Sequence, residues 1–192
     1  MGANKQLSKG KLLVAMPVLR DPNFLQTVVL LCEHGPDGSL GVVVNRPTGI
    51  EVSSLINESS DFSLGQTDLS GAGQIYNGGP VGQSGMLILY RGDAAPKGLG
   101  ILKDVYLLTD LDALAIPERL GPDGKVRCYL GYAGWESGQL EAEIQSGAWR
   151  LMQGDSRLIF DTDPATVWQE MMRRMGRDWT IYASMPPDLS LN

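Results

Sequence analysis

Histidine and cysteine, which supply much of the nucleophilic and metal-binding chemistry of proteins, are scarce in this chain of 192 residues. It has one histidine, His34, and two cysteines, Cys32 and Cys128. Every mechanism that needs an imidazole therefore has to use His34. Two cysteines in a chain of this length do not make a disulfide scaffold, and both lie in apolar, strand-like runs. We expect buried, free thiols in a reducing cytoplasm.

Long apolar runs and an excess of positive charge are also missing. The run Leu12 to Met16 is too short for the core of a signal peptide, and nothing downstream approaches a membrane span. We expect a cytoplasmic protein that has no membrane partner. The net charge of −6 makes the average field repel a nucleic acid duplex, so no direct binding to nucleic acid is expected. The one dense basic group, Arg173, Arg174 and Arg177, lies at the end of a predicted helix, where cations complement the helix dipole.

The familiar catalytic and cofactor motifs do not occur. The glycine-rich segment 77–82, NGGPVG, lacks the lysine and hydroxyl residue of a phosphate-binding loop and does not join a strand to a helix, which favours a turn. No GxSxG motif is present. A zinc site needs three or four ligands, and only Cys128 and carboxylates could complete one that began with Cys32 and His34. We therefore expect no metal and no cofactor.

The composition, with 43% hydrophobic residues and 24 glycines scattered singly through apolar runs, indicates one domain over residues 1–192 with a strongly curved sheet. Strands and short helices mix without strict alternation, which predicts an α+β fold with a curved, mostly antiparallel sheet packed around a few helices. A central hairpin is predicted over residues 27–46. Further strands are predicted at 12–16, 75–77, 86–90, 98–108 and 126–132.

Two helical stretches are the clearest. In residues 131–149, a strand is followed by a turn and a short helix that Gly147 closes, and Trp135 and Trp149 anchor the stretch to the core. Near the C-terminus, Asp163 caps a helix that Gly176 ends. Its apolar stripe consists of Trp168, Met171, Met172 and Met175. Short helices are also predicted at 52–56 and 110–115, and a long surface loop at 58–73.

Cys32 and His34 are the weak candidates for catalysis. Alternation along a strand places both side chains on one face, where they could act as a nucleophile and its base. The structural interpretation, a buried thiol and a histidine held near a turn, is favoured. Glu141 and Glu143 lie about 200° apart around their helix and cannot form a carboxylate pair. Of the two, Glu141 lies closer to the apolar side and is predicted to have the capping or buried polar role.

A second candidate site lies at the other end of the hairpin. The simplest register puts His34 opposite Leu40 and Val28 opposite Arg46, which separates the two ends by about 20 Å. An ion pair between Arg46 and Asp21 is predicted beside the turn at residues 21–24. It either fixes that turn, the favoured interpretation, or forms a notch for an anion or peptide. The candidate binding residues are Asp21, Asn45, Arg46, Gly78, Gly79 and Pro80.

Five segments in order resemble the AlgH/YqgE family of bacterial proteins. They are GKLLVAMPVLRDPNF (10–24), TVVLLCEH (27–34), GVVVNRP (41–47), YNGGPV (76–81) and GYAGWESGQLEAEIQSGAW (131–149). In the family a strand ending in histidine usually follows the GGPV segment, whereas this chain has Leu89 and Tyr90 there.

The resemblance implies a compact domain with a coiled sheet around helices. It also brings the label of transcriptional regulator, which rests on a genetic effect on alginate production in one member, and no established enzymatic activity. The acidic charge and the absence of a helix-turn-helix pattern favour indirect regulation. Two functions are therefore open: a non-enzymatic protein that binds an unknown protein or small-molecule partner, or a small enzyme or thiol redox protein that uses Cys32 with His34.

Overall fold

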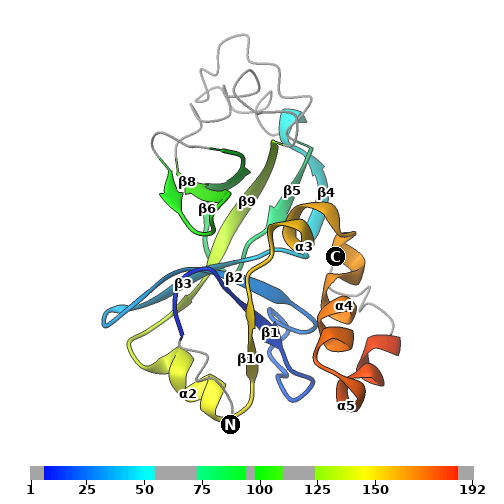
Figure 1. Ribbon diagram of the computed structural model, residues 1–192. Coiled ribbons are helices and arrows are strands. Elements are labelled where there is room, and N and C mark those ends of the chain that lie inside the picture. The colour runs from blue at the N-terminus through cyan, green and yellow to red at the C-terminus, as the bar shows by residue number, and fades with distance from the viewer. Residues whose placement is uncertain (1–6, 55–72, 94–97, 110–123, 186–192) are drawn as a thin grey trace.

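A strongly curled sheet dominates the structure, a computed structural model that describes residues 7–54, 73–93, 98–109 and 124–185 (Figure 1). In spatial order its main path is β10 (Trp149–Gln153), β1 (Lys11–Ala15), β2 (Val28–Gly35), β3 (Gly38–Val43), β9 (Lys125–Trp135), β6 (Val81–Arg91), β8 (Val105–Leu108) and β7 (Leu99–Gly100). The strand β5 (Gln74–Asn77) pairs in parallel with β9, and β4 (Pro47–Glu51) pairs with β5. The other pairs are antiparallel, so the predicted α+β class with a curved, mostly antiparallel sheet is confirmed.

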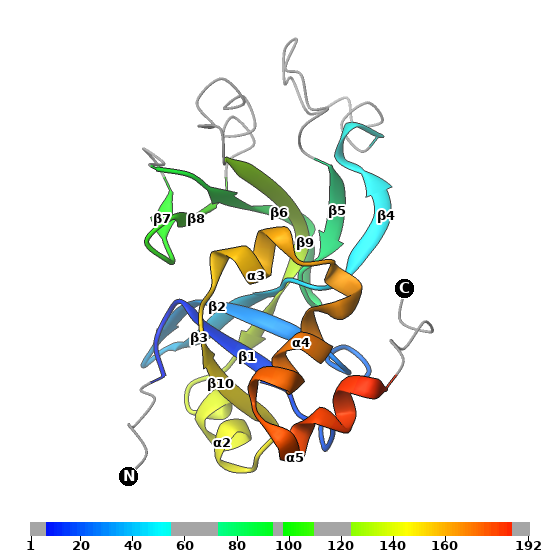
Figure 2. The same cartoon turned by 45° about the vertical axis from the view of Figure 1, so that its right-hand side comes forward.

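Helices lie on both sides of this sheet. The described helical elements are α2 (Gln139–Gln145), α3 (Ser156–Asp161), η3 (Pro164–Thr166), α4 (Val167–Arg174), α5 (Arg177–Thr180) and η4 (Tyr182–Ser184). Figure 2 shows α3 and α4 across the β1–β2 face, where Leu158, Trp168 and Met171 pack in one core cluster with Leu12 and Leu30. Leu140 of α2 belongs to a second cluster with Leu13, Val29 and Leu31, whose side chains alternate to the opposite face. None of the helices in the described part of the chain has the length and apolarity that crossing a bilayer requires.

The clearest local predictions are confirmed. The hairpin predicted over residues 27–46 is β2 and β3, and the short helix of residues 131–149 is α2, followed by Gly147 with a φ of 83°. Asp163 caps the 3-10 turn η3 by accepting a hydrogen bond from the N–H of Ala165, and α4 continues from that turn. Trp135 and Trp149 are buried as predicted.

Other local predictions need correction. The sequence did not indicate α3, and it did not indicate the strand β4 that begins at Pro47. Residues 52–54 are helical, but the rest of the predicted helix at 52–56, the helix at 110–115 and almost all of the loop at 58–73 lie outside the described residues.

The predicted register of the hairpin is wrong. Val29 lies opposite Val43 and Leu31 opposite Gly41, but Glu33 lies opposite Leu40, so Cys32 is an extra residue in a β-bulge. A bulge offsets the alternation of side chains by one position. Cys32 packs in the cluster on the α4 side, whereas His34 reaches Glu141 of α2 on the other side. The prediction that Cys32 and His34 share a face is therefore wrong as well.

Glycines allow the backbone to cross closely at the centre of the sheet. The N–H of Gly78 donates to Leu130 of β9 (2.8 Å) and its carbonyl accepts from Val43 of β3 (2.9 Å), so one residue bridges the two strands. On β9, Gly131 has a φ of 70°, and a Cβ atom there would lie 2.5 Å from the carbonyl oxygen of Gly79. The crossing therefore needs glycine at Gly131 for both its conformation and its space.

The variant Gly131→Ala tests this crossing, and Gly147→Ala is its control. Gly147 has the same left-handed conformation as Gly131, but nothing lies within 4 Å of a Cβ atom added there. Gly147→Ala should cost about 1–2 kcal/mol of unfolding free energy, the price of the conformation alone. Gly131→Ala should cost about 3 kcal/mol or more, since backbone must also move. Urea unfolding curves of both variants measure the difference, and equal losses would contradict the close crossing.

One carboxylate holds the corner between β9, α2 and β10. Glu143 accepts hydrogen bonds from the indole N–H groups of Trp135 (3.0 Å) and Trp149 (2.7 Å). Phe24 packs against both tryptophan rings, which meet each other edge to face at 5.9 Å. The predicted assignment of the buried polar role to Glu141 is wrong, because the side chain of Glu141 is 51% exposed and its ion-pair contact is with His34 at 3.6 Å.

Glu143→Ala should therefore destabilise the protein by about 3 kcal/mol, since two hydrogen bonds to a charged acceptor are lost and two indole N–H groups lose their partner. Glu141→Ala, two residues away on the same helix, should change the unfolding free energy by less than about 0.5 kcal/mol. Thermal and urea unfolding of the matched pair provide the measurement. A comparable loss in the two variants would show that Glu143 does not hold the corner.

Candidate functional site

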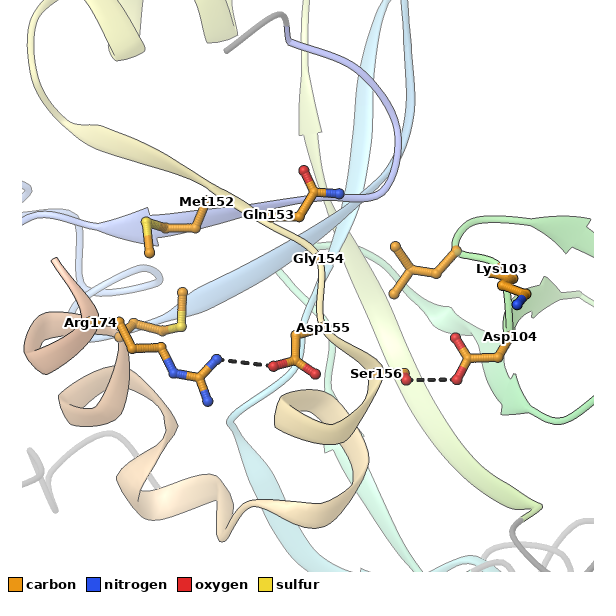
Figure 3. Close-up of a pocket in the computed structure, with 10 residues that line it drawn as sticks. Lys103, Asp104, Met152, Gln153, Gly154, Asp155, Ser156 and Arg174 are labelled. Carbon is orange, nitrogen blue, oxygen red and sulfur yellow. Dashed lines mark hydrogen bonds and ion pairs between the residues drawn. The ribbon is translucent and has the colours of Figure 1, made fainter. Parts of the chain in front are cut away.

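A groove of about 570 Å³ lies where the end of β10, the start of α3, the side of α4 and the turn before β8 meet (Figure 3). Its apolar surface comes from Leu102, Met152 and Met171. Its polar residues are Lys103, Asp104, Gln153, Asp155, Ser156 and Arg174. The groove is therefore amphipathic, with flexible methionine side chains that can adapt to the shape of a bound group.

The acidic groups at the rim are held by neighbours. Asp155 caps α3 by accepting from the N–H groups of Arg157 (3.0 Å) and Leu158 (3.3 Å), and it pairs with the Arg174 guanidinium at 3.0 Å. Partial burial acts to raise the pKa of Asp155, but the hydrogen bonds from Arg174 and the two N–H groups outweigh it and lower that pKa. Asp104 accepts a 2.6 Å hydrogen bond from the hydroxyl of Ser156.

This arrangement is better suited to binding than to acid–base catalysis. A general base needs a pKa raised towards neutrality, whereas the pKa of Asp155 is lowered. The hydroxyl of Ser156 donates to a carboxylate, and the only histidine lies outside the groove. Among the residues that the structure describes, no group of three or more histidine, cysteine, aspartate or glutamate side chains is placed to hold a metal ion.

The geometry does not support Cys32 and His34 as a reactive pair. Cys32 is fully buried, and burial together with the nearby Glu33 carboxylate raises the pKa of its thiol to about 12. Cys128 is also free and buried, which confirms the expected state of both thiols, and burial raises its pKa to about 12. A reactive thiol needs the opposite shift.

His34 joins the hairpin to α2. Its Nδ1 lies 2.9 Å from the hydroxyl of Ser39, directly across the hairpin, and its Nε2 lies 3.6 Å from Glu141. A second cavity of about 370 Å³ is lined by both Cys32 and His34, but the side chain of Cys32 is fully buried and its thiol donates to the carbonyl of Leu30. The contacts of both side chains fit the favoured structural interpretation.

Arg46 fixes the turn, although through contacts other than the predicted one. Its guanidinium donates to the carbonyl groups of Asn23 (2.7 Å), Pro22 (3.1 Å) and Leu25 (3.1 Å). The carboxylate of Asp21 accepts instead from the backbone and side-chain N–H groups of Asn23. The predicted Arg46–Asp21 ion pair is thus replaced by contacts with backbone carbonyl groups.

The remaining residues of the predicted notch also hold backbone in place. The side chain of Asn45 accepts from the N–H of Val28 (2.8 Å) and donates to the carbonyl of Gln26 (2.9 Å). Gly78 and Gly79 are buried in the sheet crossing, and Pro80 is exposed beside them. The structure brings the predicted residues into one region but gives the polar ones structural partners.

The sequence reasoning missed the residues of the groove. Asp155 and Ser156 stand directly before the apolar run Leu158 to Phe160, which is the pattern of a helix N-cap and would have indicated α3. No local signal indicates that Arg174, which is 19 residues further along the chain, pairs with Asp155.

The curled sheet, the helices on both of its sides and the amphipathic groove define a small α+β protein. The sequence profile described as AlgH-like matches residues 12–180, and the chain belongs to this family. The resemblance seen in its five segments is thereby confirmed.

Relatives and solved structures agree with this assignment. A UPF0301 protein of Streptomyces avermitilis is 40% identical over 191 residues, covering 95% of this chain and 94% of the relative. One of Cytophaga hutchinsonii is 33% identical, covering 97% and 100%. The solution structure of the AlgH protein from Pseudomonas aeruginosa superposes with a TM-score of 0.71 at 32% identity, covering 96% of this chain and 97% of that one. A crystal structure of a protein from Corynebacterium diphtheriae, at 22% identity, shares the fold with a TM-score of 0.77 over 96% and 95% of the two chains.

The buried thiols give a direct prediction for alkylation. With a pKa near 12, about one thiol in ten thousand is ionised at pH 8, and access requires opening of the core. In the native protein Cys32 and Cys128 should react with a thiol reagent at least a thousandfold more slowly than the exposed thiol of a Ser137→Cys variant. In denaturant, Cys32 and Cys128 should both react as fast as the thiol of the Ser137→Cys variant. Rapid labelling of native Cys32 would restore the thiol hypothesis.

Proposed function

We propose that the protein is a non-enzymatic binding protein that contacts a protein partner through the groove between α3, α4 and the turn at residues 102–104. Any regulatory role is then exercised through this partner, without direct binding to nucleic acid. The observation that carries the proposal is the amphipathic groove itself. Its floor is apolar and its acidic groups are satisfied by Arg174, Ser156 and backbone N–H groups.

The chemistry of the groove favours a short amphipathic segment of a protein as the partner. The side chains of Met152 and Leu102 remain partly exposed, and they would bury further apolar area against the partner's own apolar side chain. Lys103, which makes no ion pair with any described residue, stands exposed at the rim and could meet an acidic group. The net charge of −6 disfavours a nucleic acid partner, so a regulatory role of the kind that the family label names would be exercised through a protein.

A photo-crosslinking amino acid at Gln153, on the groove, tests the proposal in cells. The same amino acid at Gln145, exposed on α2, is the matched control. We expect a protein adduct from position 153 that is absent from position 145. The purified adduct partner should bind the unlabelled protein, and Met152→Lys should weaken that binding at least tenfold because it puts a charge on the apolar floor.

Arg173→Gln, on the same helix but outside the groove, should leave the dissociation constant unchanged. Calorimetry or fluorescence anisotropy gives the constants. The groove would be refuted as the contact surface by equal adducts from both positions or by no adduct at all. A dissociation constant that is unchanged in Met152→Lys would refute it as well.

A further inference from the structure

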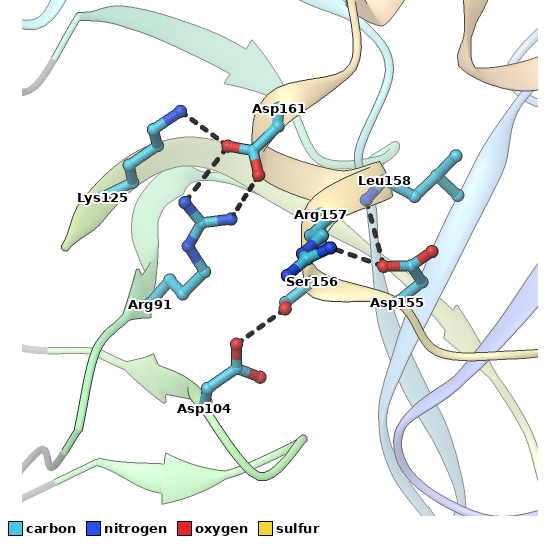
Figure 4. A network of polar contacts seen from close by, with 8 residues as sticks. All are labelled: Arg91, Asp104, Lys125, Asp155, Ser156, Arg157, Leu158 and Asp161. Carbon is cyan, nitrogen blue, oxygen red and sulfur yellow. Dashed lines mark hydrogen bonds and ion pairs between the residues drawn. The ribbon is translucent and has the colours of Figure 1, made fainter. Parts of the chain in front are cut away.

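The carboxylates of the groove are almost fully engaged by the protein itself. One oxygen of Asp155 accepts from two backbone N–H groups of α3, at 3.0 and 3.3 Å, and the other accepts from Arg174 at 3.0 Å. Figure 4 shows the contact of 2.6 Å between the hydroxyl of Ser156 and Asp104. Of the oxygens of these two carboxylates, only Oδ1 of Asp104 has no hydrogen bond with the described residues. The groove therefore has little left with which to accept from a cationic partner.

The polar groups of the groove that remain unused are donors. Lys103 stands exposed and makes no hydrogen bond or ion pair with any residue in the described ranges. The side-chain carbonyl of Gln153 accepts from Nζ of Lys11 at 2.8 Å, but its amide N–H groups have no acceptor in the part of the chain that the structure describes. Lys103 and Gln153 line the groove together with the apolar side chains of Leu102 and Met152. A ligand that satisfies these groups has to bring an acceptor.

Helix α3 holds one wall of the groove in place before a partner arrives. At its C-terminal end, Asp161 binds Arg91 of β6 at 2.7 Å and Lys125 of β9 at 2.6 Å (Figure 4). The hydrogen bonds from Arg91 and Lys125 lower the pKa of Asp161 to about 2, so these contacts persist throughout the neutral pH range. At the N-terminal end, Asp155 ties the helix to α4 and Ser156 ties it to the turn before β8. A wall that is fixed at both ends needs little further ordering when it binds.

The charges around the groove favour an acidic segment over a basic one. Its lining contains two cations and two carboxylates, whereas the chain as a whole has a net charge of −6. At physiological ionic strength exposed charges more than about 8 Å apart are largely screened, so the local balance decides. A basic segment would have to displace Arg174 or Ser156 from their carboxylates. An acidic segment meets the unpaired ammonium group of Lys103 directly.

We propose that the partner segment presents an aspartate or glutamate beside an apolar residue. The apolar side chain packs on the floor that Leu102, Met152 and Met171 form. The carboxylate accepts from the ammonium group of Lys103 and from the amide of Gln153. Because an exposed ion pair adds little affinity, Lys103 selects among apolar segments rather than supplying most of the binding energy. This charge preference rests on the proposed function, because it belongs to the same groove.

Selection of short random peptides displayed on phage tests this preference. Peptides that bind the folded protein are kept, and those that also bind Met152→Asn, which makes the floor polar without changing its charge, are discarded. We expect the remaining groove-dependent peptides to be enriched in aspartate and glutamate next to leucine, isoleucine, methionine or phenylalanine. Enrichment of lysine and arginine, or no enrichment of charge, would overturn the acidic preference and leave the groove as a contact surface. Failure to obtain any groove-dependent peptide would refute the groove as a peptide-binding surface and the preference with it.

The enriched acidic peptide then tests Lys103 directly, with dissociation constants from fluorescence anisotropy. Lys103→Gln should weaken its binding about three- to fivefold. Exchanging the carboxylate of the peptide for the corresponding amide should weaken binding to the parent protein by a similar factor. The two changes together should weaken binding no more than either one alone, because they remove the same contact.

Lys9→Gln is the matched control for the loss of one positive charge, since Lys9 is exposed and lies outside the groove. It should bind the acidic peptide as the parent protein does. Losses in affinity that multiply when the two changes are combined would show that Lys103 does not contact the carboxylate. An equal loss in Lys9→Gln would assign the effect to overall charge and would overturn the role of Lys103 as well.

Discussion

The fold depends on the close backbone crossing at which β9 passes from one half of the curled sheet to the other. The first half of β9 lies between β5 and β6, and its last residues pair with β3. Between these regions, Gly78 bridges β3 and β9 through its N–H and carbonyl groups, and Gly131 turns the strand through a left-handed conformation. A side chain at either position would separate the two halves, so the curl itself rests on the small size of these residues.

The crossing also explains where the unusual polar groups lie. The bend leaves irregular backbone beside β3, β5 and the turn at residues 22–25, whose carbonyl and N–H groups need partners. Arg46 and Asn45 satisfy that backbone, which is why residues that stand out in the sequence as a binding motif have structural roles. Arg127 likewise holds backbone in place, since its guanidinium donates to the carbonyl of Val44 and lies over the rings of Tyr76 and Phe160.

Much of the fold could be predicted from the sequence, because the elements concerned have local patterns. The turn residues between the two apolar runs predict the β2–β3 hairpin, and the cap at Asp163 with its apolar stripe predicts η3 and α4. The hairpin register was beyond prediction, since β2 is apolar on both faces and offers no alternation against which to detect the bulge at Cys32. The sites could not be predicted for a similar reason. An arginine within a strand has the same pattern whether or not its charge is paired, and the partner of Asp155 is on another helix.

The corner held by Glu143 has a consequence for optical spectroscopy of this protein. Two of the four tryptophans share this carboxylate, with ring centroids 5.9 Å apart and planes at 79°. Indole chromophores at such a distance and angle couple electronically and produce an exciton couplet in circular dichroism. Much of the intrinsic emission and ellipticity that experimenters follow during refolding therefore reports the assembly of one corner. A time course of this couplet describes when β9, α2 and β10 meet, whereas Trp168, whose indole donates to the carbonyl of Ala15, reports separately on the packing of α4.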